Sequence, residues 1–328
     1  MGSGPSLFRR VRFRLEFWGL RVFGSLVRFL PLAWLPPIAR AAGRVVFALD
    51  RHGSAVALAN LEAAFGSSLT PARRKAVARM SYQNFARTML ELFWSPNLTA
   101  ETAARIARFE DRGGSLNRTD GRPIICVCLH FSNFEWLSQF TCFHASRAMV
   151  VTQSFKNPLI GPVFDRLRRS TGHEVIPQER AMLRMLKHLK RGGRFHVVID
   201  LNLDPREPGV VIDQFGGLKS CVTQIHAVLA EKTGAVIVPA ECRLRPDGSY
   251  HMILHEALED RPGTAAREIV QHCWNVLEPA LREQPECWLW SYKHWRFRPE
   301  DAPAGRYPFY ANTARRFDKL LASQDNVP

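Results

Sequence analysis

The chain has 328 residues, of which 46% are hydrophobic and 10% aromatic, enough to bury one large core. Its formal net charge of +15 at pH 7 favours polyanionic partners: nucleic acid, an anionic membrane surface or an acidic substrate. The seven cysteines are odd in number and scattered, with no CxxC pair and no Cys/His spacing of zinc type. They argue against a disulfide framework or a metal site and predict a reducing compartment. We interpret Cys126 and Cys128 as small core residues rather than metal ligands.

The N-terminal region is apolar but interrupted by charge. Residues 7–37 are rich in leucine, phenylalanine, valine and tryptophan, yet six arginines and one glutamate lie among them. The longest uncharged run, 29–39, is shorter than the roughly 20 residues that a membrane-spanning helix needs. A cleavable signal peptide is not expected either, because the charges are not confined to a short leading segment and no small-residue cleavage site follows.

The arginines of this region recur at helical spacing. At about 100° per residue, one narrow arc of a helix contains Arg10, Arg14, Arg21 and Arg28. Much of the opposite side is apolar: Leu15, Val22, Phe23, Leu26 and Leu30. Such a helix can lie in a membrane interface, with arginines at the anionic headgroups. The alternative is an ordinary amphipathic helix that packs on the body of the protein. We expect an interfacial helix as a unit of its own, residues 1–40.

Further along the chain, the sequence pattern changes from helices alone to strands that alternate with helices. Residues 41–94 are helical, with a start signal at Thr70-Pro71. Beyond Pro123, the predicted strands are 124–129, 148–152, 195–199, 235–239 and 250–254. The predicted helices are 133–145, 158–171, 180–190, 220–233 and 264–283. Strands that alternate with helices predict an α/β fold, with a mostly parallel central sheet flanked by helices. We expect one domain over residues 41–300 and a tail over 301–328, with a short helix at 312–322.

A histidine and a glutamate stand where such sheets bind ligands. His130 follows the apolar run 124–129, and Glu135 comes five residues later, in the first turn of the next helix. Ligands of parallel sheets bind beyond the carboxyl ends of strands, where Asp200 also lies. If Ser132 or Asn133 caps the helix, Glu135 can turn back to orient the imidazole as a general base. A solvated helix start beside a core histidine would give the same pattern.

The motif and several further blocks resemble the lipid A late acyltransferases, of the lauroyl and myristoyl type within the glycerolipid-acyltransferase superfamily. The resemblance covers about residues 17–300. It is carried by the His-x4-Glu motif 130–135, by Asn84-Phe85-Ala86-Arg87 with Glu91, by 157–159 and 169–172, and by the closing segment 285–300, which contains Trp288, Trp290 and Trp295. No GxSxG elbow is present, so direct acyl transfer is favoured over an acyl-enzyme.

The resemblance implies roles for particular residues. His130 would be the base and Glu135 its orienting partner. The substrate-binding candidates are Asn133, Arg169, Asp200, Phe215 and Gly216. The chain departs from the family's pattern in two places. It has Leu201-Asn202-Leu203-Asp204 after Asp200 where the family often has Asp and Tyr-Gly, which concerns the acceptor, and Gln214 replaces an aromatic residue before Phe215.

The resemblance also implies a substrate and a location. The protein would be a peripheral enzyme on the cytoplasmic face of the bacterial inner membrane, without a cofactor or metal. It would take a fatty acyl chain from acyl carrier protein to a hydroxyl of a lipid A precursor, an anionic glycolipid. Three alternatives stay open: a superfamily acyltransferase for another glycolipid, aminolipid or specialised metabolite; an inactive membrane scaffold; and a basic nucleic-acid-binding protein. The last is disfavoured because no nucleic-acid-binding motif is recognised and the N-terminal arginines are mixed with bulky apolar residues.

Overall fold

The centre of the molecule is a seven-stranded sheet. The structure is a computed structural model, and it describes residues 7–118, 120–144, 147–152, 155–179, 181–258 and 263–325. The strand order is β1-β9-β8-β2-β5-β3-β4, and neighbouring strands are parallel except for β8 and β9. These strands are β1 Ala107–Asp111, β2 Ile124–Cys128, β3 Ala148–Thr152, β4 Glu174–Pro177, β5 Arg194–Val198, β8 Val236–Leu244 and β9 Tyr250–Leu254. The predicted α/β fold with a mostly parallel central sheet is therefore confirmed.

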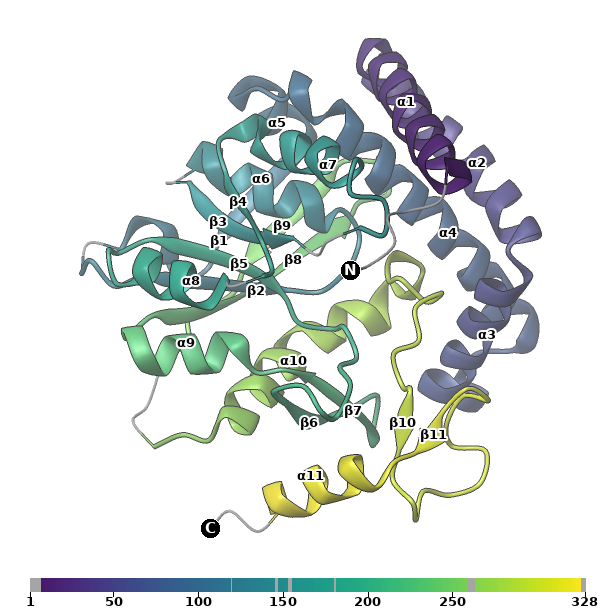
Figure 1. The fold of residues 1–328 in the computed structure, drawn as a ribbon, viewed down its shortest axis with the longest axis vertical. Coiled ribbons are helices and arrows are strands. Elements are labelled where there is room, and N and C mark those ends of the chain that lie inside the picture. Colours follow the sequence, from purple (N-terminus) through teal and green to yellow (C-terminus); the bar gives the residue numbers. More distant parts are fainter. Residues whose placement is uncertain are drawn as a thin grey trace.

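Helices cover both faces of this sheet (Figure 1). One layer contains α5 Ala100–Ile106, α6 Phe134–His144 and α7 Gly161–Arg168, and the other contains α8 Ala181–Leu189, α9 Ile225–Thr233 and α10 Ala266–Glu283. All five residues of β2 are buried. Ile125 and Val127 belong to the apolar core that includes α8, α9 and α10, whereas Cys126 and Cys128 belong to the core that includes α6. A parallel strand covered on both faces is apolar throughout, which is why this run is readable from the sequence.

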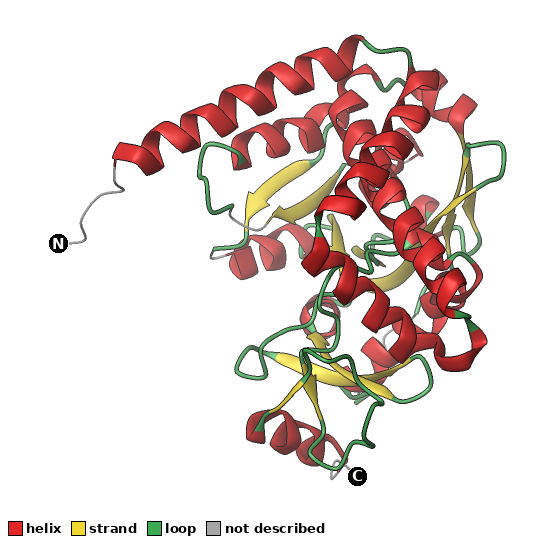
Figure 2. Ribbon diagram, turned by 90° about the vertical axis from the view of Figure 1, so that its right-hand side faces the viewer, coloured by secondary structure: helices red, strands yellow, loops and turns green. Residues whose placement is uncertain are grey.

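Four helices form a further layer at one side of the sheet. They are α1 Leu7–Phe29, α2 Leu35–Leu49, α3 Arg51–Phe65 and α4 Pro71–Trp94. The N-terminus of α4 is the predicted one, since the Thr70 side chain accepts a hydrogen bond from the Arg73 backbone N–H. Figure 2 shows α1 as a long helix whose N-terminal end extends past the body of the protein. Only Phe13 and Val27 of α1 are fully buried.

One stretch of the described chain, Leu32–Leu49, has the length and apolar composition needed to cross a membrane. Of this stretch, 17% is buried inside the protein. The expectation of no spanning segment rests on uncharged runs, and Arg40 and Arg44 interrupt this one. Its helix α2 packs closely on α4, because a Cβ atom at Gly43 would lie 2.4 Å from the Cα atom of Gln83. Glycine is required here for the two backbones to approach.

A smaller unit adjoins the sheet after β5. It contains the antiparallel hairpin of β6 Gly209–Gln214 and β7 Leu218–Thr223, the short strands β10 Phe297–Arg298 and β11 Asn312–Thr313, and α11 Arg315–Asp325. Phe317 of α11 is buried against Val211 and Cys221 of the hairpin. Two helix predictions are wrong at their starts. Residues 220–223 belong to β7, because they pair with β6, and residues 312–313 belong to β11.

Candidate active site

Two residues that follow neighbouring strands meet at the carboxyl edge of the sheet. Cys128 of β2 lies opposite Val198 of β5, so His130 and Asp200, each two residues further on, are adjacent. The Nδ1 atom of His130 lies 2.7 Å from Oδ1 of Asp200. The backbone N–H of His130 donates to Oδ2 of the same carboxylate at 2.9 Å, and Nε1 of Trp288 donates to Oδ2 at 2.7 Å.

This carboxylate is ionised at neutral pH. Asp200 is fully buried, and burial opposes its charged form, but the charge of His130 and the hydrogen bonds from His130 and Trp288 outweigh it and lower the pKa of Asp200 to about 2. Because Nδ1 of His130 faces a carboxylate, the hydrogen-bond network assigns the ring proton to Nδ1 and leaves Nε2 to accept one. The His130 side chain keeps 19% of its surface exposed, so a ligand can approach it.

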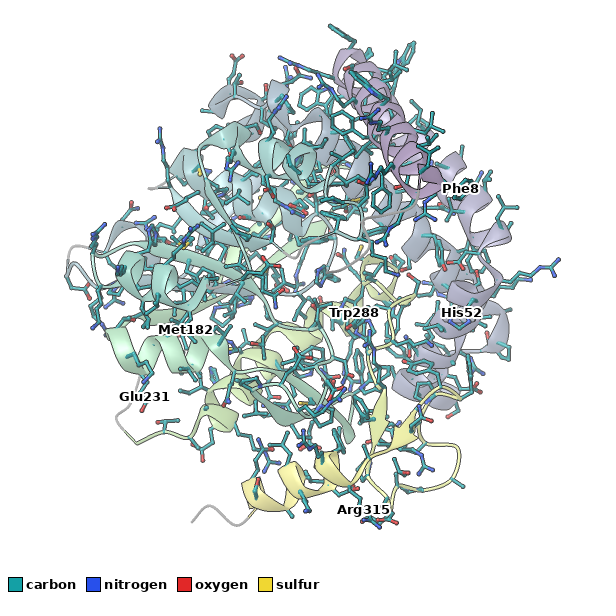
Figure 3. The ribbon with its side chains drawn as sticks, viewed as in Figure 1. Phe8, His52, Met182, Glu231, Trp288 and Arg315 are labelled. Atoms are coloured by element: carbon teal, nitrogen blue, oxygen red, sulfur yellow. The ribbon has the colours of Figure 1, made fainter. Side chains whose placement is uncertain are left out.

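The aromatic side chains of Trp288 and His294 support Asp200. The ring of His294 stacks on the indole of Trp288 with centroids 3.8 Å apart, and its Nε2 atom lies 2.9 Å from the carbonyl oxygen of Leu289. Burial lowers the pKa of His294 to about 4, so this ring is neutral at pH 7. Trp288 lies in the interior of the molecule, between the sheet and the layer of α3 and α4 (Figure 3).

The turn that joins His130 to α6 is held by hydrogen bonds to residues of other segments. Ser132 has a φ of 50°, a left-handed conformation that is unfavourable for a residue other than glycine. Its backbone N–H donates to the carbonyl of Cys287 at 2.7 Å, and its own carbonyl accepts from Oγ1 of Thr88 at 2.9 Å. Asn133 then caps α6, since its Oδ1 atom accepts from the backbone N–H of Trp136 at 2.8 Å.

A buried glutamate of α4 lies beneath this turn. Glu91 accepts hydrogen bonds from Nε of Arg87 at 2.7 Å, from Nδ2 of Asn133 at 2.6 Å and from the Tyr250 hydroxyl at 2.5 Å. It is 1% exposed, and burial raises its pKa even though these partners oppose the rise. The substrate-binding candidate Asn133 is itself fully buried, so the structure gives it contacts that hold the turn.

Glu135 has a different partner from the one expected. Its carboxylate accepts hydrogen bonds from Arg168, from Nε to Oε2 at 2.9 Å and to Oε1 at 3.2 Å, and from Nη2 to Oε1 at 2.5 Å. Burial disfavours the charged guanidinium, but the charge and hydrogen bonds of Glu135 outweigh this and raise the pKa of Arg168. The carboxylate that holds the His130 ring in this structure is that of Asp200, not that of Glu135.

The other substrate-binding candidates lie away from the imidazole. Arg169 is exposed, and its Nη2 atom donates to the carbonyl of Val175 at 2.6 Å. Phe215 is buried in the turn between β6 and β7 with a φ of 45°, and its ring centroid lies 5.7 Å from that of Trp288. Phe215 therefore supports Asp200 through Trp288. Gly216 is exposed in the same turn, with a φ of 74°.

Sequence reasoning missed three contributors to this site. Trp288 was noted only as part of the closing segment 285–300, but it is buried and its indole N–H donates to Asp200. Arg168 could not be separated from Arg169 by residue type alone. Glu91 carried the clearest signal, because it is one carboxylate within the otherwise apolar segment 89–94 of a helix. An isolated acid on a buried helix face needs partners, which marks it as part of a polar network.

Comparison with known protein families shows which family the chain belongs to. The model of the bacterial lipid A biosynthesis acyltransferases matches residues 7–297. The chain belongs to this family. It is also 24% identical to the lipid A biosynthesis lauroyltransferase of Escherichia coli (strain K12) over 304 residues, which cover 89% of this chain and 95% of the relative. The resemblance drawn from the sequence is therefore confirmed.

Among the residues that the structure describes, no group of three or more His, Cys, Asp or Glu side chains that could hold a metal ion is found. Two cavities beside β2 each hold about 10 Å³, room for about one water molecule. Neither cavity is large enough for a fatty acyl chain.

Proposed function

We propose that this protein transfers a fatty acyl group from a thioester of acyl carrier protein to a hydroxyl of a lipid A precursor, on the cytoplasmic face of the bacterial inner membrane. The observation that carries the proposal is the pairing of His130 with ionised Asp200 at the carboxyl edge of the sheet, in a chain of an acyltransferase family. The arrangement supplies a base whose tautomer is fixed, which direct transfer between an alcohol and a thioester requires.

The reaction follows from the orientation of the imidazole. Nε2 of His130 accepts the proton of the acceptor hydroxyl as its oxygen attacks the carbonyl carbon of the thioester. The C–S bond then breaks, and the thiolate leaves and takes the proton from the imidazolium. Asp200 stabilises the imidazolium between these two steps. General-base catalysis of this kind contributes roughly 10²–10⁴ in rate.

The remaining charged groups serve the anionic substrate. In this proposal, the orienting role expected for Glu135 falls to Asp200, and Glu135 fixes the guanidinium of Arg168 through hydrogen bonds. Arg168, with its exposed neighbours Arg166 and Arg169, would bind a phosphate of the acceptor. Arginine suits this role because its planar donors match phosphate oxygens in pairs.

Helix α1 supports attachment to a membrane surface. Its buried residues Phe13 and Val27 face the protein, so the exposed apolar side chains lie on the outward side. Those side chains are Leu7, Phe8, Val11, Leu15, Trp18, Val22, Leu26 and Phe29. By helical spacing, Arg10, Arg14, Arg21 and Arg28 flank this side, where they would meet anionic headgroups. The surface is extended by exposed apolar residues of α2 and of the turn before it: Ile38, Val45, Val46 and Leu49 of α2, and Trp34 of the turn.

The function is tested by mass spectrometry of acceptor lipids. Wild-type protein and the His130→Ala variant are incubated with acyl carrier protein thioesters and with lipid A precursors, other anionic glycolipids and aminolipids. We expect one acyl group on a lipid A precursor with the wild type and loss of this product with the variant. Equal product from both proteins would overturn the role of His130. Product on an acceptor outside the lipid A precursors would move the protein to a different substrate class.

Membrane attachment is tested separately by flotation with anionic vesicles. Replacing the exposed Leu15 and Val22 together by aspartate should abolish flotation, because it places charge in the apolar side of α1. Phe309, which is 67% exposed and lies outside α1 and α2, provides the matched control as Phe309→Asp. Flotation of the double variant at the wild-type level would overturn the assignment of α1.

A further inference from the structure

Helix α8 presents a cationic side that the reaction does not use. Ala181, Met185 and Leu189 are buried and fix the inner side of the helix. The outward residues are all exposed, two of them apolar and four basic: Met182, Leu183, Arg184, Lys187, Lys190 and Arg191. We call these six residues the α8 face. No acidic residue occurs between 181 and 193, and the four cations make no ion pair among the described residues. Four cations beside an exposed leucine form a surface that suits an acidic protein partner.

The α8 face begins at the same edge of the sheet as the active site. The helix follows β4, whose carboxyl end lies on the edge that carries His130 and Asp200, and it leads back to the start of β5. Its exposed apolar residues Met182 and Leu183 therefore lie at the end of α8 nearest the site. At 1.5 Å per residue, the nine-residue helix spans about 13 Å, and the cations extend from Arg184 and Lys187 in the helix to Lys190 and Arg191 in the turn beyond it.

The position of the face argues against a membrane as its occupant. Figure 3 labels Phe8 of α1 and Met182 of α8, and the two residues lie on opposite sides of the molecule. In Figure 1, the exposed helices α1 and α2 likewise lie at the side away from α8. A planar bilayer against the apolar side of α1 would not reach α8, which stays open to a soluble partner.

We propose that the α8 face is the docking surface for the acidic carrier protein that delivers the acyl thioester, with Leu183 in an apolar contact and Lys187 and Lys190 opposite carboxylates. This inference rests on the proposed function, since it assigns the surface for the donor of that reaction. Donor and acceptor then approach from different sides: the carrier at α8 and the lipid at α1. A small contact of this kind is transient, forms quickly through charge and weakens with salt.

The test compares two donors that carry the same acyl chain, the carrier protein thioester and a short pantetheine thioester without the protein. The variant is Lys187→Glu with Lys190→Glu in the full chain. The matched control is Arg73→Glu with Lys75→Glu, which changes the charge equally at two exposed residues of α4. We expect KM for the carrier thioester to rise about tenfold or more and to lose much of its salt dependence. Turnover of the pantetheine thioester should be unchanged, as should both activities of the control.

A titration of isotope-labelled carrier protein tests docking without turnover. Wild-type protein should shift carrier resonances of acidic residues, and the α8 variant should not. An unchanged KM for the carrier thioester, or equal losses with both donors, would overturn the docking surface. A variant that loses vesicle flotation while its carrier KM stays at the wild-type value would identify the face as a membrane contact and would also overturn it. If the wild type transfers no acyl group from either donor, the proposed function fails, whatever the titration shows.

Discussion

The carboxylate of Asp200 holds His130 at two points, the ring Nδ1 atom and the backbone N–H, although 70 residues separate the two in the chain. One bond sets the tautomer of the ring, and the other sets where the chain leaves β2. A single side chain therefore controls both the protonation and the position of the base.

Replacing Asp200 by asparagine should lower the rate of acyl transfer by about 10³, because the amide can donate to Nδ1 and favour the wrong tautomer. Glu135→Gln should cost less, since that carboxylate binds Arg168. Both variants are compared in initial rates with Asp204→Asn, a loop residue that pairs with exposed Arg206. A larger loss in Glu135→Gln than in Asp200→Asn would return the orienting role to Glu135.

Arg168 and Arg169 are adjacent but should respond differently to alanine. Arg168→Ala leaves the carboxylate of Glu135, which is 7% exposed, without its cation and should destabilise the protein by roughly 2–3 kcal/mol. Arg169→Ala removes an exposed guanidinium whose bond goes to a backbone carbonyl, and it should cost under about 1 kcal/mol. Urea denaturation measures both variants. Equal losses would contradict the assignment of the buried pair to Arg168.

The network at Glu91 should matter for stability and for the catalytic turn. Glu91→Ala leaves Arg87 and Asn133 without their shared acceptor and should cost roughly 3 kcal/mol. Tyr250→Phe removes one donor and should cost about 1 kcal/mol. Glu62→Ala is the matched control, since Glu62 is 67% exposed in its pair with Arg74 and should change stability by about 0.5 kcal/mol or less. A Glu91 variant as stable as that control would refute the network.

Acid should destabilise the fold through buried histidines before it reaches Asp200. Neither ring nitrogen of His226 has a hydrogen-bond partner among the described residues, and burial lowers its pKa to about 3. The unfolded chain takes up the proton near pH 6.5, so this group costs stability as the pH falls from about 6.5 toward 3, by about 1.4 kcal/mol per pH unit. His294 adds to the loss down to about pH 4.

The measurement is the free energy of unfolding as a function of pH for wild type and His226→Leu. In this pH range, the slope for the variant should correspond to the uptake of about one proton fewer on unfolding. His52→Gln, at an exposed position, should keep the wild-type slope. If His226→Leu also keeps that slope, His226 is not a source of the acid sensitivity. Asp200 has the opposite range: its lowered pKa gives stability that is complete above about pH 4 and is lost as the pH falls toward 2.

The strands that the sequence reveals are those buried on both faces. Residues 124–128, 148–152 and 250–254 form uninterrupted or nearly uninterrupted apolar runs, and the structure places β2, β3 and β9 there. β1 and β4 lie at the two edges of the sheet and contain charged residues, so no apolar run marks them. The hairpin residues 220–223 were assigned to a helix because they lead directly into one.

The candidate site was predictable in its location but not in its pairings. His130 and Asp200 were each placed after a strand, and both lie at that edge. That they touch depends on β2 and β5 being neighbours, which no local pattern encodes. The expected partner of Glu135 was His130, whereas its carboxylate binds Arg168, and the substrate-binding candidate Arg169 is the next residue. Helix α7 ends at Arg168 and continues as a 3-10 turn from Arg169 to Thr171, so helical spacing no longer describes this point.

Helix α4 contacts both helix α1, the proposed membrane-binding element, and the turn after His130, the proposed base. Near its C-terminus, Phe93 packs edge-on against Phe23 of α1, and the indole N–H of Trp94 donates to the carbonyl of Leu30. Within the preceding two turns of the same helix, Thr88 and Glu91 hold the turn after His130. Helix α4 thus connects helix α1, which would lie on the membrane, to the turn that would position the base. A change in the tilt of α1 on the bilayer would therefore move α4 and, with it, the turn after His130. Contact with the membrane would then affect the geometry of the site as well as the location of the enzyme.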